Sequence, residues 1–359
     1  MLDESLWFRA VTLPSRSAHL LVTACDAGTA NYLVPVLPHL DMPWRVFAHG
    51  EAAEILTAHG VPCTLIERKG WDGLAAMGRA ALDSGHYSAL VAGTSWGPTL
   101  DKAAIAASRA ARLPSAAIVE HWSLYRERFT RVDRASAQAD EFLPDWIWLN
   151  DEIALTEAQA AGLCAQRLRV VGQPHLELQR ERLAIFTHTP RDQRVVFVSE
   201  RLRDDFRRNP ALDPGFDEFA AVEGLCAALP AGMRLAIKLH PQEPADKYAS
   251  LVSGGRATVI GKADAGKLVA QAGRVVGMMS MLLLEAALVR DDVISFMPGG
   301  RAQDFIGNRI GATRPATTID QLRALLAALP GNMPAVDFGR RFVGSAERAR
   351  AAITEFACA

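Results

Sequence analysis

The dominant feature of the sequence is a regular alternation of short, apolar, β-rich runs with stretches long enough to form a helix. Residues 101–112, for example, contain alanines throughout and have helical character. Strands that alternate with helices in this way predict a parallel sheet covered by helices on both faces. In the first half of the chain we expect strands at residues 19–25, 44–48, 62–66, 89–92, 116–119, 145–149 and 168–171.

A polar stretch between Pro174 and Asp192 interrupts this rhythm, and a second series of strands begins directly after it. We therefore expect an α/β protein with two Rossmann-like, doubly wound domains that face each other across a cleft, at residues 1–180 and 181–341. Residues 342–356 have helical spacing and can cross back onto the first domain. The second series of strands is expected at residues 194–198, 234–237, 257–260, 274–276 and 293–296.

The composition is that of a globular protein and argues against some classes of function. Hydrophobic residues make up 50% of the chain and charged residues 22%, with a formal net charge of -1. A general nucleic-acid binder needs a basic surface to neutralise phosphates, so no nucleic-acid partner is expected. The N-terminus is acidic, unlike a signal peptide, and no run reaches about 18 consecutive apolar residues. The five cysteines lack CxxC spacing, which favours buried thiols and a cytoplasmic protein with at most a peripheral membrane contact.

Two motifs in the second half of the chain point to a phosphorylated ligand. Lys238-Leu239-His240-Pro241 closes one expected strand, and Ser280 opens a helix after another. A lysine and an imidazole can neutralise phosphate, and the start of a helix turns backbone N–H groups toward an anion. Both motifs would emerge at the carboxyl edge of one parallel sheet, where such sheets bind ligands. We predict a nucleotide site formed by Ser199, Glu200, Lys238, His240, Pro241, Gly277, Ser280 and Glu285.

The first half of the chain offers candidates for catalysis at its own strand ends. The first strand-to-helix turn contains Asp26 and Gly28 but lacks the GxGxxG pattern, so no NAD or FAD cofactor is expected. Asp26 is either a helix N-cap or an active-site carboxylate. Glu120 and His121 follow a later strand, and either can supply a general base. Because adjacent strand residues point to opposite faces, we expect only one of these two to face the cleft.

Residues next to these candidates can bind an acceptor molecule. Trp122 belongs to an aromatic group with Tyr125 and Phe129, which can instead serve only as packing. The predicted acceptor-binding residues are Thr94, Ser95, Trp122 and Arg126.

Two groups of charged residues are candidates for further sites. The first is a basic run formed by Arg126, Arg128, Arg131 and Arg134. We expect these side chains to lie on a solvated surface; an anionic-acceptor site and a weak membrane contact are the alternatives. Neither Asp204-Asp205 nor Asp291-Asp292 has the Asp-x-Asp form of a metal-bound nucleotide-sugar site, and no spacing suggests zinc. No metal is therefore expected.

This arrangement of motifs resembles a GT-B type glycosyltransferase. The second domain resembles bacterial enzymes that use cytidine-nucleotide donors, notably sialyltransferases and CDP-glycerol glycerophosphotransferases, because residues 238–241 look like their His-Pro motif and Ser280 like their phosphate turn. Residues 280–287 are also similar to the glutamate-bearing helix of UDP-N-acetylglucosamine 2-epimerases, which implies that Glu285 binds ribose hydroxyls. The Asp/Glu-Asp/Glu-Gly motif of several sialyltransferases is absent, and Asp26-Ala27-Gly28 matches it only in part.

The resemblance implies a metal-independent glycosyltransferase. Its donor would be a nucleotide sugar, with CMP or CDP preferred and a CMP-nonulosonic acid as one example. Its acceptor would be a hydroxyl of a glycan, glycolipid or protein in surface-glycan or glycoconjugate synthesis. The second domain would bind the donor, and Asp26, Glu120 or His121 would activate the acceptor. The alternatives are a nucleotide-sugar epimerase or hydrolase of the UDP-N-acetylglucosamine 2-epimerase type and a non-catalytic nucleotide-sugar-binding module.

Overall fold

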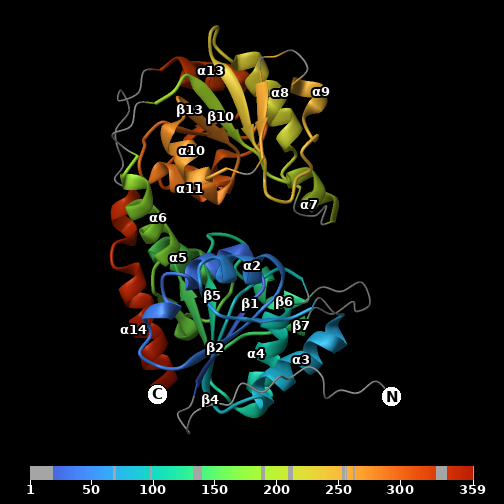
Figure 1. The fold of residues 1–359 in the computed structure, drawn as a ribbon, viewed down its shortest axis with the longest axis vertical. Coiled ribbons are helices and arrows are strands. Elements are labelled where there is room, and N and C mark those ends of the chain that lie inside the picture. Colours follow the sequence, from blue (N-terminus) through green and yellow to red (C-terminus); the bar gives the residue numbers. More distant parts are fainter. Residues whose placement is uncertain are drawn as a thin grey trace. The chain divides into compact units, whose positions relative to one another are not determined.

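The computed structural model describes residues 19–67, 70–97, 99–131, 140–186, 191–208, 213–252, 255, 257–261, 263–328 and 338–358. The chain forms two compact units, each with its own sheet (Figure 1). The first unit contains Met1–His175 and Gly344–Ala359, and the second contains Leu176–Val343. Helix α6 (Pro174–Ala184) carries the chain from the first unit into the second.

A seven-stranded parallel sheet forms the centre of the first unit, in the order β3-β2-β1-β4-β5-β8-β9. All strands expected in this half are present, although β3 is short and β4 begins two residues earlier than expected. A small antiparallel hairpin of β6 and β7 was not expected, because each of its strands has only two residues. The strands are β1 (His19–Ala24), β2 (Trp44–Ala48), β3 (Thr64–Leu65), β4 (Tyr87–Ala92), β5 (Ser115–Val119), β6 (Thr130–Arg131), β7 (Asp140–Glu141), β8 (Trp146–Leu149) and β9 (Leu168–Val170).

Helices cover both faces of this sheet. On one face, α1, α2 and the C-terminal helix α14 contribute side chains to a single hydrophobic core. On the other face, α4 contacts β1, β4 and β5 and packs against α3. The bounds are α1 (Ala27–Leu33), α2 (Gly50–Ala58), α3 (Trp71–Asp83), α4 (Leu100–Ala111), α5 (Glu152–Ala160) and α14 (Ser345–Cys358), with short 3-10 turns at Leu37–His39, Glu127–Phe129 and Ala165–Arg167.

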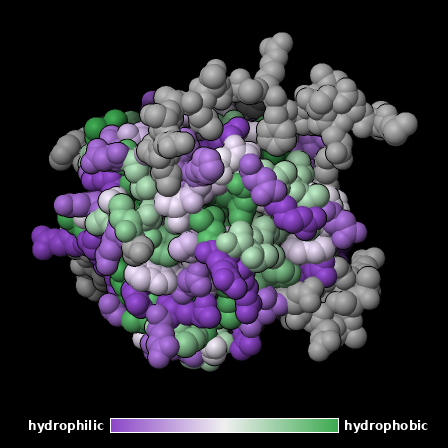
Figure 2. All heavy atoms as spheres, turned by 90° about the horizontal axis from the view of Figure 1, so that it is seen from below, coloured by the Kyte–Doolittle hydropathy of each residue, from purple (hydrophilic) through white to green (hydrophobic). Residues whose placement is uncertain are grey.

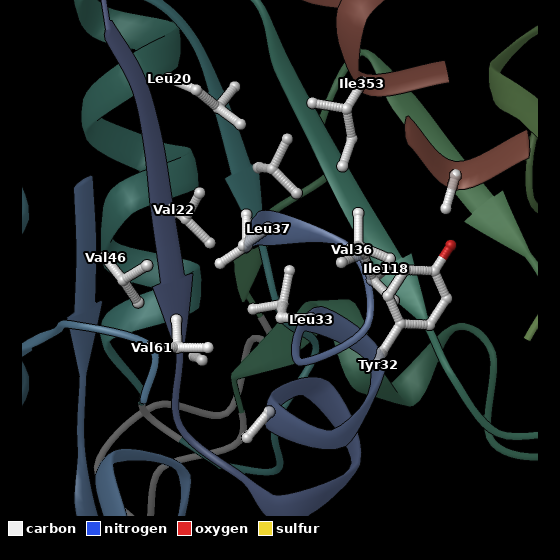
Figure 3. Close-up of a cluster of buried hydrophobic side chains, with 14 of the residues drawn as sticks. Leu20, Val22, Tyr32, Leu33, Val36, Leu37, Val46, Val61, Ile118 and Ile353 are labelled. Carbon is white, nitrogen blue, oxygen red and sulfur yellow. The ribbon is translucent and has the colours of Figure 1, made fainter. Parts of the chain in front are cut away.

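The core of the first unit follows from the alternation of side chains along β1. Leu20 and Val22 point to the same face, where Ile353 of α14 packs with them (Figure 3). All three side chains are fully buried, and burial of one such aliphatic side chain stabilises the fold by about 1.5–3 kcal/mol. Phe356 of α14 also lies 5.8 Å from Trp148, ring centre to ring centre. The helical spacing expected for residues 342–356 is therefore confirmed, and this helix is part of the core of the first unit.

A six-stranded parallel sheet forms the centre of the second unit, in the order β12-β11-β10-β13-β14-β15. All five expected strands are present. The additional edge strand β15 was not expected; it contains Pro315, which is tolerated at a sheet edge. The strands are β10 (Arg194–Val198), β11 (Arg234–Lys238), β12 (Ala257–Ile260), β13 (Arg274–Gly277), β14 (Val293–Phe296) and β15 (Arg314–Ala316).

The helices of the second unit are mostly short. The helix expected to start at Ser280 is confirmed as α11. The apolar sequence of its first turns predicts burial against the sheet, but Met281 and Leu282 are only half-buried, whereas Leu283 and Leu284 are fully buried. The helices are α7 (Leu202–Arg208), α8 (Glu218–Ala228), α9 (Ala249–Val252), α10 (Ala265–Gln271), α11 (Met281–Ala287), α12 (Ile306–Arg309) and α13 (Ile319–Ala327), with 3-10 turns at Ala302–Asp304 and Phe338–Phe342.

Both sheets have a point where the strand order reverses. It lies between β1 and β4 in the first unit and between β10 and β13 in the second. Ligands of open α/β sheets bind at the carboxyl ends of the strands beside such a point. Asp26 and Thr94 follow β1 and β4, while Glu200 and Ser280 follow β10 and β13. The topology thus brings the candidate residues of each unit to the reversal point of its own sheet.

The surface differs from one expectation. Buried thiols were expected, but Cys164 and Cys358 are exposed, and Cys25, Cys63 and Cys226 are half-buried. On the face shown in Figure 2, hydrophobic residues (green) lie in patches between hydrophilic ones (purple). Across the described part of the chain, no helix combines the length and apolar character needed to cross a membrane.

Candidate functional site

Asp26 at the end of β1 is a helix N-cap. Its Oδ1 accepts a hydrogen bond from the backbone N–H of Thr29 at 2.9 Å, and its backbone is extended, as an N-cap requires. The cap role, one of the two predicted for Asp26, is therefore present. The half-buried carboxylate also lies close enough to raise the pKa of the neighbouring Glu120 carboxyl.

Glu120, directly after β5, forms a buried ion pair. Its Oε1 lies 3.1 Å from Nη1 of Arg128, and the two side chains are 10% and 5% exposed. Thr94, after β4, donates from its hydroxyl to the Ile118 carbonyl at 2.8 Å and lies 3.4 Å from the second Glu120 oxygen. Burial raises the pKa of Glu120, and the Arg128 charge opposes that rise. Arg128 is therefore not part of a solvated basic run, because Glu120 holds it inside the first unit; Arg134 of the same run is outside the described residues.

Gly28 allows Glu120 to take this position. A Cβ atom at residue 28 would lie 2.7 Å from Cγ of Glu120 and 2.8 Å from its Oε1, closer than side-chain atoms can approach. The glycine in the first turn thus accommodates a buried carboxylate of the same unit.

A second buried polar group lies at the start of α4. The Ser95 hydroxyl donates to Oδ2 of Asp101 at 2.8 Å, and Nζ of Lys102 donates to the Ser95 carbonyl. Burial raises the pKa of Asp101 and lowers the pKa of Lys102 to about 8. Thr94 and Ser95, predicted to bind an acceptor, are 2% and 4% exposed, so these internal contacts hold their side chains.

The same turn presents an aromatic side chain that was not predicted. Trp96 is 45% exposed, and Gly97 after it has a φ of 72°, in the left-handed region that glycine favours. Since the bonds of Ser95 and Lys102 fix the main chain before it, Trp96 projects from a well-anchored turn. An exposed indole offers a large flat apolar surface beside the strand ends.

The remaining candidates of the first unit differ in exposure. Trp122 is 2% exposed, and its Nε1–H donates to Oδ1 of Asp151 at 3.0 Å, so it takes the packing role that the sequence left open. His121 is half-buried, with Nδ1 2.9 Å from the Ser123 hydroxyl. Arg126 is 50% exposed and pairs with Glu141 at 3.0 Å.

The two cationic candidates of the second unit lie at the end of β11, Lys238 as its last residue and His240 in the turn that follows. Lys238 is 8% exposed, and its Nζ donates to the Leu239 carbonyl at 2.6 Å. Half-buried His240 accepts the backbone N–H of Gln242 at Nδ1, at 3.2 Å. Burial lowers the pKa of both groups. Pro241 is exposed at the tip of the turn.

Glu200, directly after β10, occupies the turn that follows β13. Its Oε1 accepts the backbone N–H groups of Met278 at 3.2 Å and Met279 at 2.8 Å. Burial raises the pKa of Glu200 to about 7, although these hydrogen bonds oppose the rise. The Glu200 carboxylate thus already accepts two of the backbone N–H groups in the turn where a phosphate was expected.

Ser280 and Gly277 complete this turn. Ser280 caps α11 by accepting the backbone N–H of Leu282 at 3.2 Å, and its hydroxyl proton remains available to donate. Gly277 is needed for packing, since a Cβ there would lie 3.0 Å from the Leu283 side chain and 3.2 Å from Cβ of Val198. Glu285, the other predicted nucleotide-site residue near this turn, is half-buried on α11.

The structure joins Ser199 to a residue that was not predicted. The Ser199 hydroxyl lies 2.9 Å from Oε1 of Glu243 and 2.5 Å from the Tyr248 hydroxyl. Glu243 lies two residues after the Lys-x-His-Pro motif. This proximity was the only feature of the sequence that could have marked Glu243 as a site residue. The ion pair of Arg128 with Glu120 and the hydrogen bond from Ser95 to Asp101 were missed, because no local pattern marks these buried contacts.

Within the described residues, no three His, Cys, Asp or Glu side chains gather closely enough to hold a metal ion. Asp292, from one of the two acidic pairs, is instead engaged by arginines. Its Oδ1 lies 2.7 Å from Nε of Arg290, and its Oδ2 lies 3.0 Å from Nη1 of Arg191. These charges hold the pKa of Asp292 below its usual value despite its burial.

No family model and no curated protein matches the sequence, whereas solved structures match the fold over nearly the whole chain. UDP-GlcNAc 2-epimerase from Methanocaldococcus jannaschii has a TM-score of 0.65 at 14% identity, with 94% of this chain and 99% of that chain covered. UDP-GlcNAc 2-epimerase from Neisseria meningitidis, bound to UDP-GlcNAc, has a TM-score of 0.63 at 11% identity, with 94% and 100% covered. The glycotransferase of kitacinnamycin has a TM-score of 0.53 at 16% identity, with 94% and 96% covered.

At these identities the likeness concerns the fold. It confirms the α/β class with two Rossmann-like, doubly wound sheets and a GT-B-like architecture.

Proposed function

We propose that this protein is a glycosyltransferase that binds the nucleotide of a nucleotide-sugar donor on its second unit. The observation that carries the proposal is the position of Lys238, His240 and Ser280 at the carboxyl ends of β11 and β13, at one edge of the second sheet. These strands flank β10, so the two turns lie on either side of the turn that carries Glu200. A cation, a ring N–H and a hydroxyl at one sheet edge suit the phosphates of a nucleotide.

Each of these groups has a distinct role in the proposed donor site. The Lys238 ammonium neutralises phosphate charge, which grows on the departing nucleotide as the glycosidic bond breaks. His240 accepts at Nδ1, so its proton lies on Nε2 and the neutral ring donates a hydrogen bond to the phosphate. The Ser280 hydroxyl donates to the same group. Because Glu200 uses the Met278 and Met279 amides, the side chains rather than these amides hold the phosphate.

The proposed general base for the acceptor hydroxyl is His121. Of the three candidates, Glu120 is sealed in its ion pair with Arg128, and Asp26 is engaged as an N-cap. His121 is half-buried, and the Ser123 hydroxyl at Nδ1 fixes its ring orientation. Trp96 in the neighbouring turn is the proposed platform for an acceptor sugar ring, and Arg126 is proposed as a further acceptor contact.

The nucleotide base is proposed from two lines of argument that differ. The Lys-x-His-Pro motif resembles that of enzymes with CMP or CDP donors, whereas similar solved structures contain bound UDP-GlcNAc and UDP. The test therefore compares CMP, CDP, UDP, GDP and ADP by thermal shift. A ligand at 100 times its Kd adds about 2.7 kcal/mol to the free energy of unfolding.

We expect a cytidine nucleotide to raise the melting temperature most. His240→Ala and Lys238→Ala should abolish the shift, whereas Lys267→Ala, which removes an exposed lysine of α10, should retain it. A shift that survives in both His240→Ala and Lys238→Ala would remove this turn from the donor site. A shift with UDP alone would overturn the cytidine preference.

A nucleotide-sugar 2-epimerase is the second candidate, because several similar structures with TM-scores from 0.62 to 0.65 carry that name. It would use the same nucleotide site without an acceptor. Incubation with a nucleotide sugar alone separates the two functions. A glycosyltransferase should leave most of the donor intact until an acceptor is added, whereas rapid formation of an epimeric sugar would establish the epimerase.

A further inference from the structure

A buried polar network links two turns at the carboxyl edge of the second sheet. Lys247 lies between the carboxylates of Glu218 and Glu243, with its Nζ 2.6 Å from Oε1 of Glu243. The Lys247 side chain is 8% exposed, and each of the two carboxylate side chains is 1% exposed. Ser199 and Tyr248 extend the network with their hydroxyl groups.

Glu243 uses both of its carboxylate oxygens, one toward each turn. Oε1 accepts the Ser199 hydroxyl at 2.9 Å, which ties Glu243 to the turn after β10. Oε2 accepts the backbone N–H of His240 at 2.8 Å, which ties it to the turn after β11. The backbone N–H of Glu243 in turn donates to the His240 carbonyl at 3.0 Å. One carboxylate therefore fixes the spacing of the two turns and the main chain of His240.

The same turn determines which ring nitrogen of His240 carries the proton. The backbone N–H of Gln242 donates to Nδ1, so the neutral ring has its proton on Nε2. If the main chain of residues 240–243 shifted, this donor would leave Nδ1 and the ring could adopt either tautomer. The contact between Glu243 and the His240 N–H holds these residues in place.

We propose that Glu243 is a positioning residue of the nucleotide site: its carboxylate joins the turns after β10 and β11 and presents the His240 imidazole as an Nε2–H donor. This role rests on the proposed binding of a nucleotide at His240. A buried ionic group is weak evidence for stability, because apolar residues of similar volume often stabilise a fold equally well. What the carboxylate supplies here is a fixed geometry between two turns.

Glu243→Gln is the informative variant, because it keeps the shape of the side chain. An amide has one acceptor oxygen where the site needs two, so either Ser199 and Lys247 or the His240 N–H must lose its partner. Glu243→Ala removes both contacts. Asp246→Asn is the matched control, since it removes an exposed carboxylate from the same segment.

The first measurement is the tautomer of His240 in the full-length free protein. The chain is labelled with ¹⁵N-histidine, and His240→Gln identifies the resonances among the nine histidines. We expect one Nε2–H tautomer in the wild type and in Asp246→Asn, and a mixture in Glu243→Gln. The pKa of His240 should also fall in Glu243→Gln, because the Glu243 charge raises it. An unchanged tautomer in Glu243→Gln and Glu243→Ala would overturn the proposal.

The second measurement is the Kd of the nucleotide that stabilises the wild type. Glu243→Gln should weaken binding about tenfold at an unchanged far-ultraviolet circular dichroism spectrum, while Asp246→Asn binds like the wild type. Wild-type affinity in Glu243→Gln would overturn the positioning role. If no nucleotide binds the wild type, the proposed function fails, and the tautomer measurement alone decides the role of Glu243.

Discussion

Arg128→Ala is the sharpest test of how the first unit is built, because it leaves the Glu120 carboxylate buried without its partner. The two side chains are 5% and 10% exposed and 3.1 Å apart. Breaking a buried pair by removing one partner costs about 3–5 kcal/mol, since the remaining charge is poorly solvated. We expect a loss of this size in the free energy of unfolding at pH 8.

The loss should depend on pH in a defined direction. Burial already raises the pKa of Glu120, and removal of the Arg128 charge, which opposes that rise, should raise the pKa further. A carboxyl group whose pKa is higher in the folded than in the unfolded state takes up a proton on folding. The folded state is then penalised as the pH rises above about 4.3, the usual pKa of glutamate. Arg128→Ala should therefore lose less stability at pH 5 than at pH 8.

Urea unfolding followed by tryptophan fluorescence measures this loss in the first unit. All seven tryptophans precede residue 176, so the signal reports that unit alone. The double variant Glu120→Gln/Arg128→Ala removes the uncompensated charge and should regain much of the stability lost in Arg128→Ala. Equal losses at pH 5 and pH 8, or a double variant no more stable than Arg128→Ala, would refute the reasoning.

Three further predictions follow from individual contacts. Gly28→Ala should destabilise the first unit by about 1–3 kcal/mol in the same urea assay, because its Cβ would meet the Glu120 side chain, whereas Gly70→Ala, which meets no atom within 4 Å, should cost clearly less. The pKa of Glu200, raised to about 7, predicts that the second unit loses stability as the pH rises from about 4.3 to 7; hydrogen exchange of its sheet should show this dependence in the wild type and not in Glu200→Gln. Trp96→Ala should raise the KM for a sugar acceptor about tenfold at unchanged nucleotide Kd, and equal KM values would exclude the stacking role.

The strands and the domain-scale pattern could be predicted from the sequence because they depend on local periodicity. Runs such as Leu20-Leu21-Val22 are buried on both faces of a parallel sheet and therefore read as continuous apolar segments. The strands that escaped prediction lack this signal: β6 and β7 have two residues each, and β15 contains a proline.

The contacts within the site could not be predicted, because they join residues that are distant in the sequence. The N-cap role of Asp26, one of the two roles predicted for it, can be recognised in the sequence because it depends on a residue three positions away. By contrast, Glu200 contacts Met279, 79 residues later, and no local pattern marks that pairing. The exposure of Trp96 and the burial of Trp122 likewise depend on how several strand ends pack.

Different side chains surround the reversal points of the two sheets, and this difference supports the proposed assignment of the nucleotide to the second unit. In the first unit, the turn after β1 is filled by side chains: Glu120 lies against Gly28, and Thr29 and Asp101 lie so close to Gly93 that a Cβ there would meet them at 2.6 and 3.1 Å. In the second unit, the Glu200 carboxylate bridges β10 to the turn after β13, and the Glu243 carboxylate joins the turns after β10 and β11. Because burial raises the pKa of Glu200 to about 7, a proton can neutralise this carboxylate at neutral pH, which lowers its repulsion toward an approaching phosphate. Both edges contain buried ion pairs, so the proposed assignment of the nucleotide to the second unit depends on this neutralisable carboxylate and on Lys238, His240 and Ser280.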